Sequence, residues 1–289
     1  MTPLAGRSAR RVAVVVLVLL AGCAAPAAWG PEELDRLELE LRQARADWEA
    51  RLVQVRVENG SSGELRVRSA ALDSPLFAGP AAAVEAVEIA PGAARELSFA
   101  LPEPRCEPGA RTDARVQLEL EGPRGARARF EREVPDPNGH LARIHGEDCA
   151  AAAVAAGALL RVRPEIETRR TAAGLTALVE IEMVSVPGGP RVELERVDDT
   201  VLLKPPREGE DGWPAALDSK AGVLQSLELD LVPSRCDPHA VADDKRGTFF
   251  GVRTVVDGVE QPVFFLPPGD ELRGRLRAFV GEHCGWGQG

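Results

Sequence analysis

The fold is decided by two related stretches of sequence, LPEPRCEPGARTD at residues 101–113 and LVPSRCDPHAVAD at residues 231–243. Aligned with each other, they share Leu, Arg, Cys, Pro, Ala and Asp in the same order. Further along each half, GEDC at residues 146–149 matches GEHC at residues 281–284. Features that return in a fixed order at a near-constant spacing indicate an internal duplication. The sequence therefore predicts two similar domains in tandem.

Each half also alternates apolar and polar residues with a period of two, the pattern of a β-strand with one buried face. In the first half the alternation covers residues 36–42, 53–58, 65–67, 116–120 and 128–131. In the second half the expected strands are residues 162–167, 178–184, 192–197, 227–231, 249–256 and 263–266. Short strands separated by Gly and Pro turns favour a β-sandwich. We therefore expect a mainly β fold of two tandem Ig-like β-sandwich domains, with repeat 1 at residues 34–158 and repeat 2 at residues 159–289.

Two segments have the pattern of helices. Residues 139–157 are rich in Ala and lack β-branched runs. Residues 270–282 place apolar side chains at helical spacing, and Asp270 is available as the N-cap. Each segment lies just before or across the second cysteine of its half, so we expect one short helix attached to each sandwich.

The start of the chain is ambiguous between helix and strand. Residues 31–48 also fit an amphipathic helix through their leucines and Trp48. The duplication favours a strand at residues 36–42, because it places this segment opposite residues 161–167.

The first 22 residues have the parts of a secretory signal peptide. Three arginines within residues 7–11 supply positive charge, residues 12–20 are apolar, and small residues precede Cys23. An apolar run this short is typical of a cleaved signal rather than of a membrane-spanning helix. The ending LAGC at residues 20–23 resembles the lipobox of bacterial lipoproteins.

That resemblance implies the cellular location. The signal peptide of residues 1–22 would be removed, and the Cys23 thiol would carry a diacylglyceryl group, with fatty acids of the palmitate kind. Residues 23–33 would form a short tether, and the protein would be lipid-anchored to the cell membrane on its extracytoplasmic side. The alternative is an ordinary signal peptide in which Cys23 stands by chance.

The four remaining cysteines are Cys106, Cys149, Cys236 and Cys284. Outside the cytoplasm an even number of cysteines indicates disulfides, and four cysteines allow three pairings. The duplication favours pairing within each half, Cys106 with Cys149 and Cys236 with Cys284. Zinc ligation is the alternative, but neither a C-x-x-C nor an H-x-x-x-H spacing supports it.

Composition limits the functional class. The formal net charge is −10 and the isoelectric point is near 5.1, which excludes the basic face that a nucleic-acid binder needs. Hydrophobic residues make up 44% of the chain and charged residues 28%, as in a globular protein. The sequence contains no G-x-S-x-G, Walker A or H-E-x-x-H motif, so no common catalytic signature or cofactor site is predicted.

One cluster of polar residues follows the third of these cysteines. It consists of Asp237, His239, Asp243 and Asp244. The matching loop of the first half has Gly109 opposite His239, so the duplicated fold does not require the histidine. We interpret the cluster as a solvated turn, because Gly247 and Thr248 leave little room for a helix and Pro238 separates Asp237 from His239. The alternative is a metal site or a His-carboxylate pair in a hydrolytic enzyme.

Together these features predict a membrane-anchored extracytoplasmic lipoprotein that is not an enzyme and needs no cofactor. Its role would be binding or structural, toward a protein or another component of the cell envelope. The competing hypothesis is a metal-handling or hydrolytic protein that uses the loop containing His239.

Overall fold

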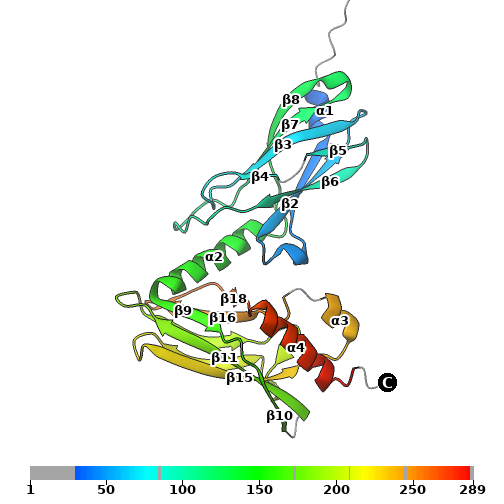
Figure 1. The fold of residues 1–289 in the computed structure, drawn as a ribbon. Helices are drawn as coiled ribbons and strands as arrows, with labels where there is room; N and C mark the ends of the chain where they lie inside the picture. The colour runs from blue at the N-terminus through cyan, green and yellow to red at the C-terminus, as the bar shows by residue number, and fades with distance from the viewer. Residues whose placement is uncertain (1–29, 84–85, 172–173, 208, 244–245, 287–289) are drawn as a thin grey trace, which may run out of the picture.

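The computed structural model describes residues 30–83, 86–171, 174–207, 209–243 and 246–286. The predicted signal peptide, the lipidation residue Cys23 and Asp244 lie outside the described residues. The fold is mainly β, as predicted, and consists of two β-sandwich domains arranged one beyond the other (Figure 1).

The first domain contains two antiparallel sheets. One sheet has the strand order β1-β2-β6, formed by Leu37–Arg42, Leu52–Asn59 and Ala94–Ala100. The other has the order β4-β3-β7-β8, with β5 also paired to β3. Its strands are β3 (Leu65–Asp73), β4 (Ala81–Ala82), β5 (Val87–Ile89), β7 (Arg115–Glu121) and β8 (Arg127–Glu133). Their inward-facing residues form one apolar core, which includes Val55, Phe99 and Leu118.

The second domain repeats this arrangement, so the duplication seen in the sequence is also present in the topology. Its first sheet pairs β9 (Ala158–Val162) and β10 (Glu167–Thr171) with β11 (Gly174–Ser185), which pairs with β15 (Leu224–Pro233). The short strand β13 (Leu203–Lys204) pairs antiparallel with β15 on its other side. Its second sheet contains β12 (Val192–Asp198), β14 (Gly212–Asp218), β16 (Phe250–Val256), β17 (Val259–Glu260) and β18 (Phe264–Leu266). The order β9-β11-β15 thus corresponds to β1-β2-β6.

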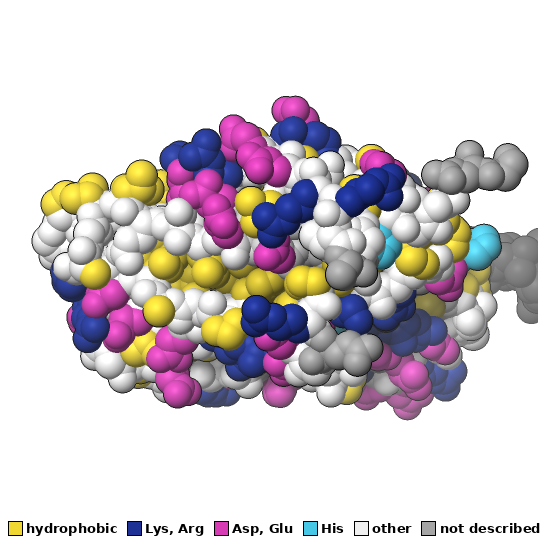
Figure 2. All heavy atoms as spheres, turned by 90° about the horizontal axis from the view of Figure 1, so that it is seen from below, with side chains coloured by type: hydrophobic (Ala, Val, Ile, Leu, Met, Phe, Trp, Pro, Cys, Tyr) yellow, Lys and Arg dark blue, Asp and Glu magenta, His cyan; other side chains and the backbone are white. Residues whose placement is uncertain are grey.

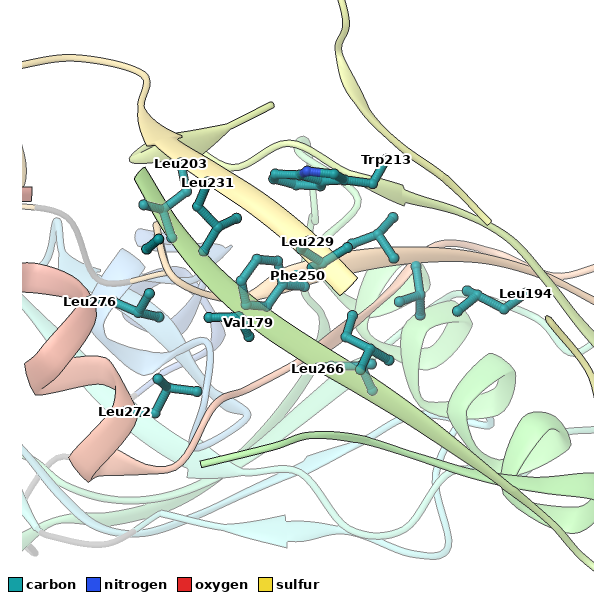
Figure 3. Packing of buried hydrophobic residues seen from close by; sticks show 14 of the residues in the cluster. Val179, Leu194, Leu203, Trp213, Leu229, Leu231, Phe250, Leu266, Leu272 and Leu276 are labelled. Atoms are coloured by element: carbon teal, nitrogen blue, oxygen red, sulfur yellow. The ribbon is translucent and has the colours of Figure 1, made fainter. Parts of the chain in front are cut away.

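The second core lies between these two sheets (Figure 3). Phe250 is fully buried near its centre, with Val179 and Leu229 from the facing sheet. Trp213 closes one side of the sandwich, and its indole N–H donates to the carbonyl of Asp230 at 2.9 Å. This bond joins edge strand β14 to β15 across the two sheets.

Helices complete both domains. They are α1 (Pro31–Asp35), α2 (His140–Gly157), α3 (Pro238–Asp243) and α4 (Asp270–His283), with 3₁₀ turns η1 at Arg45–Asp47 and η2 at Pro123–Gly125. The two expected helices are present as α2 and α4. The predicted N-cap of α4 is wrong: Gly269 occupies that position, and Asp270 is the first helical residue. An acidic residue in the first helical turn still favours the positive end of the helix dipole.

Two further predictions can be compared with the strands. Residues 36–42 were expected to form a strand rather than a helix, and β1 occupies residues 37–42. The expected strand at residues 162–167 is wrong, because β9 ends at Val162 and β10 begins at Glu167. Pro164 lies between these two strands. Because a proline supplies no N–H to a strand ladder, it interrupts the expected strand.

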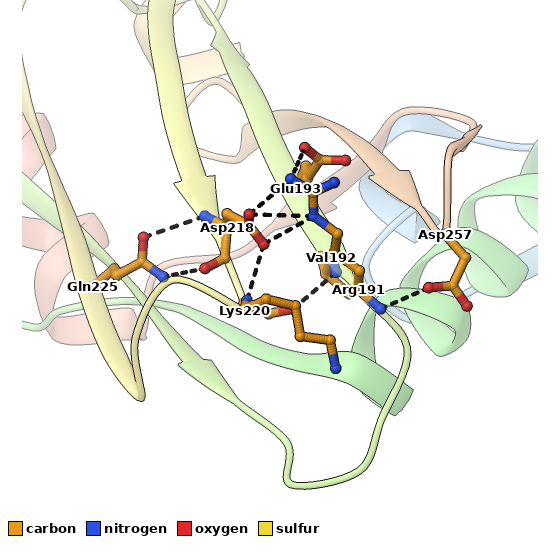
Figure 4. Close-up of polar contacts among 8 residues, drawn as sticks. Arg191, Val192, Glu193, Asp218, Lys220, Gln225 and Asp257 are labelled. Atoms are coloured by element: carbon orange, nitrogen blue, oxygen red, sulfur yellow. Dashed lines mark hydrogen bonds and ion pairs between the residues drawn. The ribbon is translucent and has the colours of Figure 1, made fainter.

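Ion pairs and hydrogen bonds stabilise the turn between β14 and β15 (Figure 4). Arg191 binds Asp218 through two guanidinium nitrogens, at 3.2 and 2.8 Å, and this hydrogen bonding holds the pKa of Asp218 below its ordinary value. Gln225 accepts from the backbone N–H of Asp218. The Lys220 ammonium donates to the carbonyl of Gly189, which lies against the C-terminal end of α2.

No helix among the described residues is both long enough and apolar enough to span a membrane.

Candidate functional site

In the described part of the polar cluster around His239, residues 238–243 form a short helix, α3, instead of the expected turn. Helix α3 begins at Pro238, a residue that is favourable at the first helical position. The Asp237 carboxylate accepts a hydrogen bond from the backbone N–H of His239 at 3.0 Å, as a capping side chain does. The His239 side chain is exposed. Asp237 is thus engaged by the backbone, and among the described residues neither Asp237 nor His239 belongs to a group of three or more potential metal ligands.

The four cysteines form the predicted pairs, Cys106 with Cys149 and Cys236 with Cys284. His145 lies one helical turn before Cys149 in α2, and its Nε2 is 3.5 Å from the Cys149 sulfur and 2.8 Å from the carbonyl oxygen of Arg105. Cys106, His145 and Cys149 are the one group of potential metal ligands found among the described residues. In the disulfide state the two sulfurs bind each other, and a metal would need thiolates.

Helix α2 belongs to both hydrophobic cores. Its N-terminal half contributes Leu141 and Ile144 to the first core, while Ala150 and Val154 pack into the second. Gly157 ends the helix against the carbonyl of Pro190, where a Cβ atom would collide with that oxygen. One continuous helix therefore links the two sandwiches (Figure 1).

Trp48 lies at the junction beside this helix, in the connection between β1 and β2. The connection is held by the buried side chain of Gln54, which accepts from the Ala44 N–H and donates to Asp47 at 2.8 Å. The Trp48 ring is flanked by two guanidinium groups, with Arg143 of α2 at 5.0 Å and Arg246 of the second domain at 4.7 Å from the ring centre. Cation–π attraction therefore connects Trp48 of the first domain both to helix α2 and to the second domain.

Arg246 is enclosed by aromatic rings. Its guanidinium carbon lies 3.8 Å from the ring centre of Phe265 and 5.7 Å from that of Phe249. Only 13% of its side chain is exposed, and this burial lowers the pKa of Arg246 from its ordinary value. Glu147 of α2 lies 3.6 Å from Arg246 and also binds Arg143 at 2.7 Å.

Two more ion pairs border the junction. Arg51 of the first domain binds Asp148 of α2, and burial nonetheless raises the pKa of Asp148 above its ordinary value. Arg273 of α4 binds Glu49 at 3.1 Å across the two domains. These contacts supplement the shared helix and oppose rotation of one domain relative to the other.

A pocket of about 150 Å³ opens between these groups. Its polar lining consists of Trp48, Arg51 and Arg246 together with the acids Glu49, Glu147 and Asp148, while Ala151, Phe249, Phe264, Phe265 and Pro267 form an apolar part of the lining. None of these residues was a predicted site residue. The sequence pattern places Trp48 only in the alternative helix over residues 31–48. The arrangement can bind a small molecule by charge, hydrogen bonding and apolar contact.

Comparisons with known proteins do not identify the chain. No family model and no curated protein matches it. Among solved structures, it is similar to a protein of unknown function from Porphyromonas gingivalis W83, at 16% identity and a TM-score of 0.23, over 80% of this chain and 99% of that one. It is also similar to the YadV chaperone, at 11% identity and 0.21, over 74% and 90%. Red sea bream transglutaminase gives 12% and 0.25, over 80% of this chain and 30% of that enzyme. TM-scores this low assign neither a family nor a function.

Proposed function

We propose that this protein is a lipid-anchored lipoprotein that works outside the cytoplasm as a non-catalytic binding or structural module. The LAGC ending at residues 20–23 supports an anchor at Cys23. Two disulfides also suit an oxidising compartment. The acidic composition makes a protein or another envelope component the expected partner, rather than a nucleic acid.

The observation that carries the proposal is the helix shared by both cores. Because α2 enters both sandwiches, the two domains form one stiff arm. The described chain begins with α1, at the end of the first domain remote from the second (Figure 1). An anchor attached before α1 would therefore hold the second domain away from the membrane.

The second domain also carries the exposed apolar surface. Every large hydrophobic side chain exposed in the described part of the chain belongs to it: Leu159, Val201, Val223, Leu224 and Val259. Val184 pairs in register with both Leu159 and Leu224, which places these three side chains on one face of the β9-β11-β15 sheet. Figure 2 shows a strip of hydrophobic side chains across this end of the molecule, bordered by charged ones. Grouped exposed apolar side chains favour contact with a partner.

The stiffness of the arm can be measured by the distance between spin labels at Gln117 and Val259, which are exposed in the first and second domains. In a lipid-free chain carrying Cys23→Ser, we expect one narrow distance distribution. Trp48→Ala removes the ring that both guanidinium groups contact, so the distribution should broaden.

Val223→Ala serves as the control, because this exposed side chain lies outside the junction contacts described above. It should leave the distribution narrow. A broad distribution in the unchanged protein would reject the stiff arm.

A further inference from the structure

The two disulfides occupy matching places in the two repeats. Their first cysteines, Cys106 and Cys236, are both exposed, so a thiol in solution can reach either bond. Within the described part of the chain, only the first bond has a histidine nitrogen within 4.8 Å of both of its sulfurs. That histidine is His145, one helical turn before Cys149, and its Nε2 lies 3.5 Å from the Cys149 sulfur. The two bonds therefore differ in their surroundings although their positions correspond.

The histidine next to the second disulfide makes its contacts elsewhere. His283 directly precedes Cys284, and successive side chains on a helix do not face each other. Its Nδ1 contacts the carbonyl oxygen of Leu175, and its ring packs against Phe279 with the ring centres 6.0 Å apart. His283 is therefore a matched control for His145.

The ring of His145 is held by contacts that do not involve the disulfide. Its Nε2 lies 2.8 Å from the carbonyl oxygen of Arg105, which can only accept, so Nε2 carries the proton. Its ring contacts Phe77, with the ring centres 6.1 Å apart. The N–H of Arg105 donates to the carbonyl of Leu76 at 2.8 Å and so fixes the segment before Cys106. An N–H donor is thus in place beside the disulfide.

A donor in this place favours one direction of cleavage. In thiol–disulfide exchange the attacking thiolate bonds to one sulfur, and the other sulfur leaves as a thiolate. The exchange is faster when the leaving thiolate is stabilised, as it is by a hydrogen bond from a neighbouring N–H. Cys106 is exposed and open to attack, whereas Cys149 is half-buried beside His145. Cys149 is therefore the favoured leaving group.

The acids near this bond are paired or exposed to water. Glu147 binds Arg143 at 2.7 Å, and Asp148 binds Arg51. Glu107, which follows the first cysteine, is exposed, so water and salt screen its charge. Their repulsion of a thiolate is therefore reduced, while the imidazole N–H lies beside the leaving sulfur.

We propose that the Cys106–Cys149 disulfide is a thiol–disulfide exchange site that takes two electrons from a dithiol, and that His145 stabilises the Cys149 thiolate as it leaves. One thiolate of the dithiol bonds to the Cys106 sulfur, and the electron pair of the broken S–S bond passes to Cys149. The second thiolate of the dithiol then displaces Cys106 from the mixed disulfide. The dithiol ends as a disulfide, and its two thiol protons go to the two cysteines.

This reactivity goes beyond the binding or structural role proposed above, because the protein is the oxidant in the exchange. Cys149 lies in α2 between Ile144 of the first core and Ala150 of the second. The bond ties this shared helix to the segment after β6, so its opening would release α2 from that segment.

Reduction of the lipid-free chain carrying Cys23→Ser by dithiothreitol tests the proposal. Freed thiols are alkylated at intervals, and peptide mass spectrometry measures the opening of each bond separately. The Cys106–Cys149 bond should open about tenfold faster than the Cys236–Cys284 bond of the same molecules. His145→Leu keeps an apolar contact for Phe77 but removes the N–H, and should slow the opening of the first bond about tenfold. His145→Gln keeps an N–H donor and should restore most of the rate.

His283→Leu is the control and should leave the opening rate of the first bond unchanged. Circular dichroism verifies that each variant is folded. A second measurement needs no histidine variant: the monothiol glutathione should be captured on Cys106, with Cys149 left as the free thiol. Equal opening rates of the two bonds, an unchanged rate in folded His145→Leu, or glutathione on Cys149 would overturn the proposal.

Discussion

Replacing Cys23 by serine is expected to leave no mature-size, lipid-anchored form of the protein. The variant should appear either as a soluble extracytoplasmic protein or as an uncleaved precursor that stays in the membrane fraction, because serine lacks the thiol that a lipobox cysteine uses. Without its signal peptide the chain has a net charge of −13, since the total of −10 includes three signal arginines and no signal acids. An anionic membrane surface therefore repels it. Fractionation followed by detergent-phase partitioning measures the change.

Ala24→Ser is the matched control for this experiment, because it makes a small substitution at the next residue and leaves the thiol in place. The control should remain in the detergent phase at mature size. If Cys23→Ser gave a mature-size product that still entered the detergent phase, the lipid anchor would be rejected.

Removing the Cys106–Cys149 disulfide, by changing both cysteines to alanine, should lower the free energy of unfolding by about 4 kcal/mol. The bond joins residues 43 positions apart, and its loss raises the conformational entropy of the unfolded chain. It also ties α2 to the segment after β6. Because α2 packs in both cores, both domains should become more susceptible to hydrogen exchange. Denaturant unfolding followed by exchange measurements provides both values.

The equivalent double substitution at Cys236 and Cys284 is the natural comparison. Those residues are 48 positions apart, so the expected loss of free energy is of similar size, also about 4 kcal/mol. Its effect on exchange should centre on the second domain, because Cys284 follows α4. A loss below about 1 kcal/mol for the first pair would contradict the expected stabilisation by the disulfide. Increased exchange confined to the first domain would contradict the shared role of α2.

The fold could be predicted because its signals are local and occur twice. Alternating valines and leucines specify strands such as β2 and β7, and the repeated cysteine motif favours one of the three possible disulfide pairings. Prolines caused the strand errors. Pro164 interrupts the expected strand at residues 162–167, whereas Pro214 is accommodated in β14, an unexpected strand at a sheet edge. An edge strand can contain a proline because one side of it needs no ladder bond.

Helix ends were harder to predict than helices. Asp270 has the chemistry of an N-cap, but the helix begins at that residue and Gly269 takes the cap position. At α3 the error was the opposite one: Pro238 and Asp237 start a short helix where a turn was expected. Both cases depend on one or two backbone angles that the residue types leave open.

The junction pocket could not be predicted from local pattern. Trp48 and Arg246 lie in opposite halves of the chain, in connections without regular periodicity, and they meet only because α2 fixes the angle between the domains. The scarcity of Trp, with four in the chain, was the one available signal for Trp48. For Arg246 no signal distinguished it from the other arginines.

The most direct test of a lipid-anchored arm is the depth of each domain relative to a bilayer. The lipidated full-length protein is placed in vesicles with headgroup-quencher lipids and carries a fluorophore at either Arg66 or Arg170, both exposed. Arg66 lies in β3 of the first domain, and Arg170 lies in β10, at the far end of the second (Figure 1). We predict strong quenching at Arg66 and little at Arg170. Equal quenching at both positions, or stronger quenching at Arg170, would contradict the account.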